Sequence, residues 1–352
     1  MVEAPNRVAP AQWVLHMPLL SDLLRQVPRE VRTRVGKAKD QARAPLRDAL
    51  RAVTRLSMNS AGGPDEATGR AQVPIHLSDA LPDGIAGVQI SDNQARLAIA
   101  APHIELLRSI SRGAPDLEQL NRDLARLPGQ VPATFPHSGL LRDVGAWAAE
   151  TVAAIEVDDP IKVILNFDKD VLGSYRFDST EHRQTVANAA AIQLYWMPIG
   201  LVAVRAGISV EDLTVVVLAH ELAHAYTQLG ANIDGLRWAA SAFGRSEPAL
   251  VEALAQYYTL MTLRRTRARF PGALAAFHKL LPWQPPIYHG HKEWAEEVSP
   301  EAVRSAMLQV RGAELRTLAE FKDCLRSAIT VHPQADMKEL ESVNDDEDHR
   351  RY

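Results

Sequence analysis

Two histidines stand four residues apart in the segment His220-Glu-Leu-Ala-His224, with Glu221 directly after the first. If the segment is helical, His220 and His224 leave the same face one turn apart. Two imidazole nitrogens placed in this way suit a shared tetrahedral zinc ion. Glu221 is rotated by about 100° from His220, so its carboxylate can reach a water molecule at the metal without binding the metal. The spacing predicts one zinc ion and Glu221 as the general base of a hydrolase.

The flanking residues predict the helix that positions these side chains. Ser209 is a favourable N-cap, Glu211 suits the positive end of the helix dipole, and Gly230 suits a left-handed residue at the C-terminal end. Apart from the motif residues, 215–225 contains only Val, Leu and Ala. The imidazoles are therefore expected in an apolar environment, where an unpaired polar group is costly and a metal ion is an economical partner.

A catalytic zinc needs three protein ligands and one open position. The extended motif with a third histidine would place it at 230, where this chain has Gly230, so that class is excluded. The carboxylates between 225 and 270 are Asp234, Glu247 and Glu252. Asp234 follows too soon, in a loop, and Glu247 precedes a proline, where a carboxylate is useful as a helix cap. Glu252 lies far enough beyond the motif for the chain to turn and lay a second helix beside the first.

The segment Leu250-Val-Glu-Ala-Leu-Ala-Gln-Tyr257 resembles the third-ligand helix of gluzincin metallopeptidases, the thermolysin and aminopeptidase N type. The resemblance covers roughly residues 160–290 and is specific at this segment and at the histidine motif. It implies His220, His224 and Glu252 as ligands of one zinc ion. It also implies Glu221 as base and proton shuttle in the hydrolysis of peptide bonds in a peptide or protein substrate. A strand before the active helix, 191–196, is implied to line the cleft and to pair with extended substrate.

The chain departs from the family pattern in three places. Gln256 stands where thermolysin-like enzymes carry an aspartate that orients a ligand histidine. The glycine-rich motif by which aminopeptidases bind the substrate amine is missing, which argues against exopeptidase activity. No motif fixes the donor that stabilises the oxyanion. The best candidates are Tyr288, His289 and His291, because a loop with clustered donors follows the third-ligand helix.

Two other functions are weighed against a peptidase. The first is a zinc-binding interaction or regulatory protein without turnover, against which the intact Glu221 argues. The second is a non-peptidase zinc amidohydrolase of the deformylase type, which shares only the histidine motif and takes a cysteine ligand from an upstream segment. The single cysteine, Cys324, lies far downstream of His224, which argues against this second reading.

Basic residues strongly outnumber acids between Arg25 and Arg55. The pattern after Pro45 is amphipathic, which favours a solvated basic face on a docked helix. The alternative is contact with an acidic partner, a nucleic acid or a lipid surface. The formal net charge is -4, and no aromatic residues interleave these charges, so nucleic acid is not indicated. The chain shows no secretory signal pattern and no apolar run near the roughly 18 residues of a spanning helix, and we predict a cytoplasmic protein.

The 352 residues, 46% hydrophobic and 23% charged, fit one large domain with additions or two domains. We predict a mostly helical α+β fold. Strands are expected at 162–167, 173–177 and 191–196, and together they form a small sheet before the active-site helix. The expected parts are a helical N-terminal region 1–56 broken at Pro18, Pro28 and Pro45, a linker 57–72, a small mixed or helical region 73–155, a zincin-like metallopeptidase domain 156–335, and an acidic disordered tail 336–352.

Overall fold

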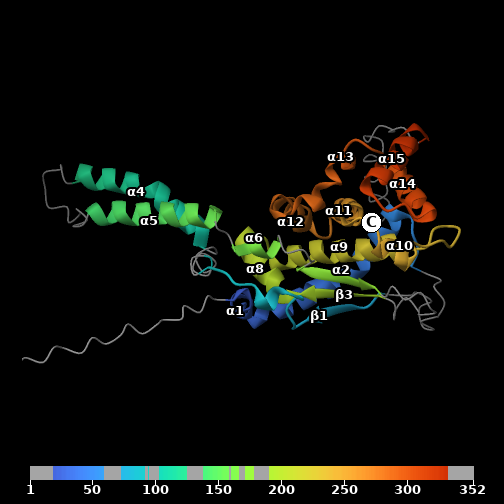
Figure 1. Cartoon of the computed structure of the whole chain (residues 1–352). Coiled ribbons are helices and arrows are strands. Elements are labelled where there is room, and N and C mark those ends of the chain that lie inside the picture. The colour runs from blue at the N-terminus through green and yellow to red at the C-terminus, as the bar shows by residue number, and fades with distance from the viewer. Residues whose placement is uncertain are drawn as a thin grey trace, which may run out of the picture. The chain divides into compact units, whose positions relative to one another are not determined.

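The computed structural model describes residues 19–58, 73–91, 94, 103–124, 138–157, 160–165, 171–177 and 190–331. The chain forms two compact units, each drawn from two stretches of sequence. Figure 1 labels their helices and strands. The first unit comprises 1–26 and 83–160, and the second comprises 27–82 and 161–352. This division differs from the boundaries expected from the sequence. The helix over residues 29–54, expected in a separate N-terminal region, packs against the helix that carries the histidine motif. The expected tail 336–352 lies outside the described residues.

The first unit contains four described helical elements. A backbone hydrogen bond of 2.9 Å from Leu20 N to Val88 O ties its two stretches of sequence together. The two long helices pack against each other through Ile104, Leu107, Ala148 and Ile155. The elements are α1 (Leu20–Arg25), the 3-10 helix η1 (Ile85–Gly87), α4 (Ile104–Leu124) and α5 (Ser138–Val157).

Over its described residues the second unit is mostly helical with a three-stranded sheet, so the α+β class is confirmed. Its first half contains α2 (Arg29–Thr54), β1 (Ile75–Ser78), α6 (Pro160–Leu165), β2 (Gly173–Phe177), β3 (Ala190–Tyr195), α8 (Trp196–Ala206) and α9 (Val210–Leu229). Its second half contains α10 (Ala240–Gly244), α11 (Pro248–Arg265), α12 (Pro271–Leu280), η3 (Leu281–Trp283), η4 (Pro286–His289), α13 (Lys292–Ala295), α14 (Pro300–Ala313) and α15 (Leu318–Val331).

The strand order of the sheet is β1-β3-β2. Strand β1 runs parallel to β3, with Ile75 opposite Ile192, and β2 runs antiparallel to it, with Tyr175 opposite the same residue. The strands predicted at 173–177 and 191–196 are therefore confirmed, apart from Trp196, which begins α8. Strand β3 is central, because both of its edges are paired. Strand β2 forms one edge of the sheet.

The strand predicted at 162–167 is wrong over its described residues, which belong to helix α6. Ile161, Ile164 and Leu165 are buried, and their spacing of three and four residues is helical. A proline at the first position also favours a helix start. The third strand is instead β1, from a part of the chain where no strand was predicted.

Helix α9 is buried on all its faces, as expected of a helix that is apolar all round. It packs against α2, α8, α11 and α12 and against strands β2 and β3. The predicted N-cap is confirmed, because Ser209 Oγ accepts a hydrogen bond of 3.0 Å from Asp212 N. The left-handed conformation predicted for Gly230 is wrong, since its φ is -64° and its ψ is 125°. A Cβ there would lie 2.5 Å from Tyr226 O and 2.7 Å from Leu56 Cβ, so the glycine permits close packing.

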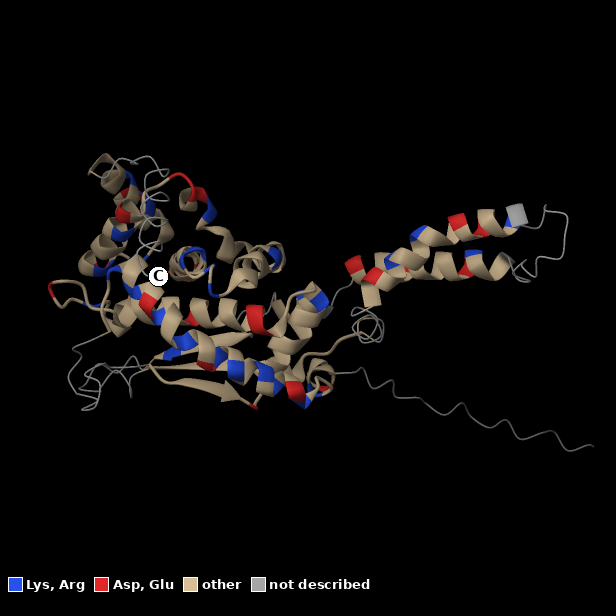
Figure 2. Cartoon of the chain, turned by 180° about the vertical axis from the view of Figure 1, so that it is seen from behind, with Lys and Arg blue, Asp and Glu red and all other residues tan. Residues whose placement is uncertain are grey.

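Helix α2 continues through Pro45 without the predicted break. Its buried residues include Val35, Ala42, Leu46 and Leu50, and this face packs along α9. Lys and Arg positions recur along the helix, with a few acidic positions among them (Figure 2). The basic side chains are partly neutralised by exposed ion pairs, Arg32 with Asp79 and Arg34 with Glu211, both at 2.6 Å, and such pairs contribute at most about 1 kcal/mol each. The docked, solvated face is therefore observed, and contact with an acidic partner stays a prediction.

Residues of the C-terminal helices contact both ends of the segment that joins α9 to α11. Arg311 on α14 is buried, and its Nη2 donates to Gly230 O at 2.6 Å and to Leu236 O at 3.2 Å. Burial lowers the pKa of Arg311 to about 10, which leaves the guanidinium charged at neutral pH. Glu247 accepts a hydrogen bond of 2.8 Å from Leu318 N at the start of α15. These contacts fix how α11 enters beside α9.

Helices that combine the length and the apolar composition needed to cross a bilayer are not found among the described residues.

Candidate metal centre

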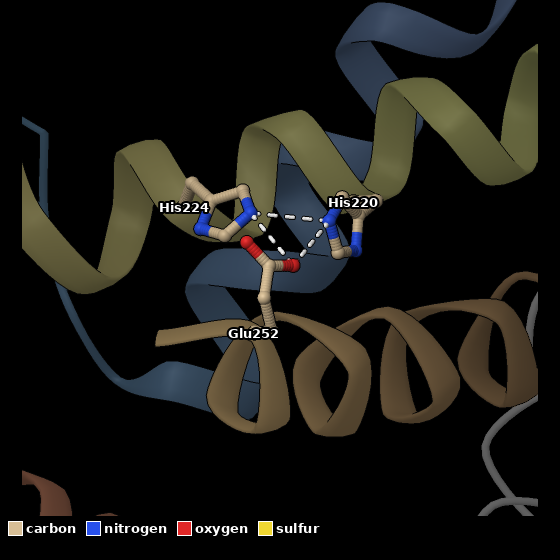
Figure 3. A group of neighbouring side chains, drawn as sticks. All are labelled: His220, His224 and Glu252. Atoms are coloured by element: carbon tan, nitrogen blue, oxygen red, sulfur yellow. Dashed lines mark hydrogen bonds and ion pairs between the residues drawn. The ribbon is translucent and has the colours of Figure 1, made fainter. Parts of the chain in front are cut away.

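His220, His224 and Glu252 converge on one point between α9 and α11 (Figure 3). The two Nε2 atoms are 3.1 Å apart. Glu252 Oε2 lies 3.2 Å from His220 Nε2 and 3.6 Å from His224 Nε2. Both histidines are buried, and Glu252 is nearly so. The three side chains that the resemblance implied as ligands are thus brought together by the fold.

The separations of these three atoms fit a tetrahedral metal ion. A tetrahedral site with metal–ligand distances of about 2.0–2.1 Å has edges of about 3.3–3.4 Å between its ligand atoms. The observed distances of 3.1, 3.2 and 3.6 Å lie on both sides of that edge. Two imidazoles and one carboxylate form a donor set that zinc accepts with one position left open.

The alternative third ligands lie elsewhere. Asp234 is exposed, and its backbone N donates to Asn232 Oδ1 at 3.1 Å in a surface turn. The Glu247 carboxylate binds the N-terminal end of α15 at Leu318. Among the described residues, the cluster of histidine and carboxylate groups contains Glu252 and neither of the other two.

Burial acts on the Glu252 carboxyl to raise its pKa, but the two imidazoles outweigh it. His224 and His220 together hold the pKa of Glu252 well below its usual range, through their charge and hydrogen bonding. The side chain is therefore a carboxylate at neutral pH, and a carboxylate ligand must be deprotonated to bind a metal ion.

The side chain of Glu221 on α9 lies against the edge strand β2. Its side chain is buried, only 1% exposed, and together with His220 it lines a pocket. At Gly173, the first residue of β2, a Cβ would lie 2.7 Å from Glu221 Oε1 and 2.8 Å from Val217 Cγ1. The missing side chain at Gly173 therefore leaves the space that the Glu221 carboxylate occupies.

Strand β2 also positions His224. The ring of Tyr175 stacks on the His224 imidazole, with centroids 6.3 Å apart and planes inclined by 9°. Tyr175 Oη donates to Gln228 Oε1 at 2.5 Å. Because Gln228 lies on the same helix as His224, this hydrogen bond holds the Tyr175 ring beside the imidazole. Burial raises the pKa of Tyr175, so its hydroxyl stays protonated and keeps donating.

Gln256 does not take the place of the family's aspartate. Its Nε2 donates to Gln284 Oε1 at 3.3 Å, and both glutamines line the pocket. His220 Nδ1 is buried and has no hydrogen-bond partner within the described part of the chain. Gln256 therefore pairs with another amide that lines the pocket.

The empty space in and in front of the pocket beside His220 and Glu221, open solvent included, is about 530 Å³. Its walls come from α6, β2, α9, α11, α12 and the loop that follows α12. Its polar lining residues are Glu221, His220, Gln256, Gln284 and Tyr288. The remaining lining residues are Leu165, Val171, Leu172, Gly173, Val216, Val217, Phe277 and Leu280. The pocket suits an apolar group held next to the candidate metal centre.

Of the three candidates for oxyanion stabilisation, the structure brings Tyr288 to the pocket. Its ring centroid lies 5.9 Å from that of His220. His289 and His291 do not line the pocket, and their rings contact backbone oxygens, Leu281 O at 2.8 Å and Tyr288 O at 3.0 Å. Burial lowers the pKa of His291 to about 4, so this imidazole is neutral at pH 7.

The strand implied to pair with substrate, 191–196, cannot do so. It is β3, whose hydrogen-bonding edges are both occupied by β1 and β2. Strand β2 contacts α9, contributes Gly173 to the pocket, and forms an edge of the sheet. Within the described residues, β2 is the strand that can accept an extended chain beside the site.

Sequence reasoning missed Gly173, Tyr175, Gln284 and the apolar pocket residues. The strand at 173–177 was expected, but its position against α9 depends on long-range packing that no local pattern encodes. Val216 and Val217 were recognised only as apolar flanks of the motif. A usable signal existed, since residues three and four positions before His220 share its helix face.

Replacing Gly173 by alanine tests how this glycine positions Glu221. The added methyl group must displace the Glu221 carboxylate or Val217, at a cost of about 1–3 kcal/mol in stability. This loss of stability is measured as a fall in the thermal unfolding midpoint. The control is Gly312→Ala, where a Cβ meets no atom within 4 Å and the midpoint should hold. A wild-type midpoint in Gly173→Ala would contradict the close packing of Gly173 against Glu221.

Compared with protein-family models, with curated proteins and with solved structures, the chain gives no match.

Proposed function

We propose that this chain is a zinc-dependent metallopeptidase of the gluzincin type, with a zincin-like catalytic unit. The observation that carries the proposal is the convergence of His220, His224 and Glu252 within 3.1–3.6 Å. The buried Glu221 beside them and the adjoining pocket support it. Zinc held by these three side chains would polarise a carbonyl group and lower the pKa of a water molecule.

The chain's own residues provide the proton transfers. Glu221 takes a proton from the attacking water as its oxygen bonds to the carbonyl carbon of the substrate. The same carboxyl group then gives that proton to the leaving nitrogen as the C–N bond breaks. The products are a carboxylic acid and an amine, and Glu221 returns to its starting state. Burial of Glu221 against Gly173 keeps the carboxylate in one position throughout.

The proposed substrate is an extended peptide segment with an apolar side chain. Such a segment adds to the edge of β2 by main-chain hydrogen bonds, the usual way in which a sheet edge binds a peptide. An apolar side chain next to the cleaved bond enters the pocket, where it contacts Val216, Val217 and Phe277. The extended binding mode and the missing amine-binding motif favour cleavage within a chain.

Metal analysis combined with a cleavage assay tests the proposal. Purified protein is expected to contain one zinc ion per chain and to cleave a peptide library next to apolar residues. A chelator should abolish cleavage, and added zinc should restore it. Protein that holds zinc but leaves the library and denatured casein intact would instead support the zinc-binding interaction protein. Protein without stoichiometric metal would remove both functions.

Tyr288→Phe tests the proposed oxyanion donor. Loss of one such donor lowers kcat by about 100–1,000-fold, and we expect this with little change in KM and with zinc retained. Steady-state kinetics on a library-derived peptide measure the effect. Tyr257→Phe is the matched control, because this buried tyrosine stacks on Trp294 and does not line the pocket. An unchanged kcat in Tyr288→Phe would place the donor elsewhere.

A further inference from the structure

The α4–α5 hairpin of the first unit leaves a large apolar face uncovered. Its core is small and lies between the two helices. Six large apolar side chains on the hairpin are each between 37% and 59% exposed: Leu106, Leu117, Leu120, Leu140, Val144 and Trp147. Exposed apolar surface of this extent marks an interaction site on a soluble protein.

The two helices run antiparallel. The middle of α4 meets the first half of α5, since a Cβ at Gly145 would collide with the Cβ of Ala114. Early residues of α4 meet late residues of α5, because Arg108 Nη2 lies 2.8 Å from Glu156 Oε1. Leu120 and Leu140 therefore lie at about the same level along the axis of the hairpin.

The exposed apolar residues lie on one face of the hairpin. With about 100° per residue, Leu117 lies on one side of the face of α4 that packs on α5, and Arg108 lies on the other. Likewise, Trp147 lies on one side of the inward face of α5, and Glu156 lies on the other. The Arg108–Glu156 ion pair shows that the two polar sides coincide. The apolar rows of both helices therefore share the opposite face, led by Leu117 and Trp147.

We propose that a second copy of this chain covers this face, so that two hairpins form an intermolecular four-helix bundle. An aromatic side chain such as Trp147 carries roughly 150–250 Å² of surface, and the five aliphatic ones carry less, so the six half-exposed side chains supply about 400–500 Å² per copy. Two copies therefore bury about 800–1,000 Å² from these side chains alone, which is at the low end for a specific interface. The polar face with Arg108 and Glu156 stays in solvent.

The residues along the face are complementary to themselves. A Cβ at Gly113 would meet no atom within 4 Å, so the apolar row of α4 has a hollow at the height of Trp147. A twofold axis parallel to the helices places Gly113 of one copy opposite Trp147 of the other, a small residue against a large one.

Light scattering coupled to size exclusion tests the proposal on the full chain. Wild type is expected at twice the chain mass of 38.7 kDa. Trp147→Glu and Leu117→Glu, which place a charge in the buried face, should each give the single mass. Arg142→Glu is the matched control on the exposed polar side of α5 and should remain a dimer.

Circular dichroism and metal content confirm that each variant is folded. A wild-type chain that is monomeric throughout a dilution series would overturn the proposal, and would leave the face to a helix of another protein. A dimer that persists in both glutamate variants would overturn it equally, because the interface would then lie elsewhere.

Discussion

Glu221→Gln is expected to lower peptide hydrolysis by about 100–10,000-fold, the contribution typical of a positioned general base. The amide keeps the size of the carboxylate and fits the space beside Gly173, but it cannot accept the proton of the attacking water. Because Glu221 is not one of the three converging ligand groups, metal content should match that of wild type. Turnover on a library-derived peptide and elemental analysis of the same sample measure both quantities.

The retained metal is the internal control of this experiment. A variant that is inactive and also lacks metal would show a damaged site instead of a missing base. Full activity with metal bound would remove Glu221 from the mechanism while leaving the metal centre in place.

Glu252→Ala is expected to reduce zinc affinity by more than the roughly 10–100-fold that follows loss of a residue supporting a metal ligand. The variant loses one of three protein ligands, and its two imidazoles remain 3.1 Å apart without the carboxylate between them. Activity should fall with metal occupancy. Zinc content after dialysis against a chelator buffer of known free zinc measures the loss.

The thermal unfolding midpoint gives a second readout for Glu252→Ala. A ligand that binds only the folded state stabilises it, so zinc should raise the midpoint of wild type more than that of the variant. Glu297→Ala changes an exposed glutamate and should keep both zinc and midpoint. An unchanged zinc stoichiometry in Glu252→Ala would show that Glu252 is not the third ligand.

Local signals predicted the parts of the site that lie on single helices. The spacing of His220 and His224, the N-cap Ser209 and the segment around Glu252 are readable because helix geometry repeats every few residues. The same reasoning failed where tertiary packing determines the secondary structure. The run at 162–165 is rich in β-branched residues, yet it is helical because Ile161, Ile164 and Leu165 face the core.

Contacts between segments that lie far apart in the chain could not be predicted from the sequence. The pairing of β1 with β3 joins residues more than a hundred positions apart, and it removes β3 from any role in binding substrate. Helix α2 passes through Pro45 because its buried face is held against α9. Tyr288 could not be separated from His289 and His291 by residue type, since only the path of the chain after α12 decides which of them faces the pocket.

The position of Arg311 limits where the chain can be truncated. Its guanidinium joins the C-terminal part of the chain to the carbonyl of Gly230, just past the end of the helix that carries both histidines. A fragment cut after α11 would contain every residue of the motif, yet would lack the cation that satisfies this helix end. The shortest piece that keeps this contact therefore extends through Arg311 in α14.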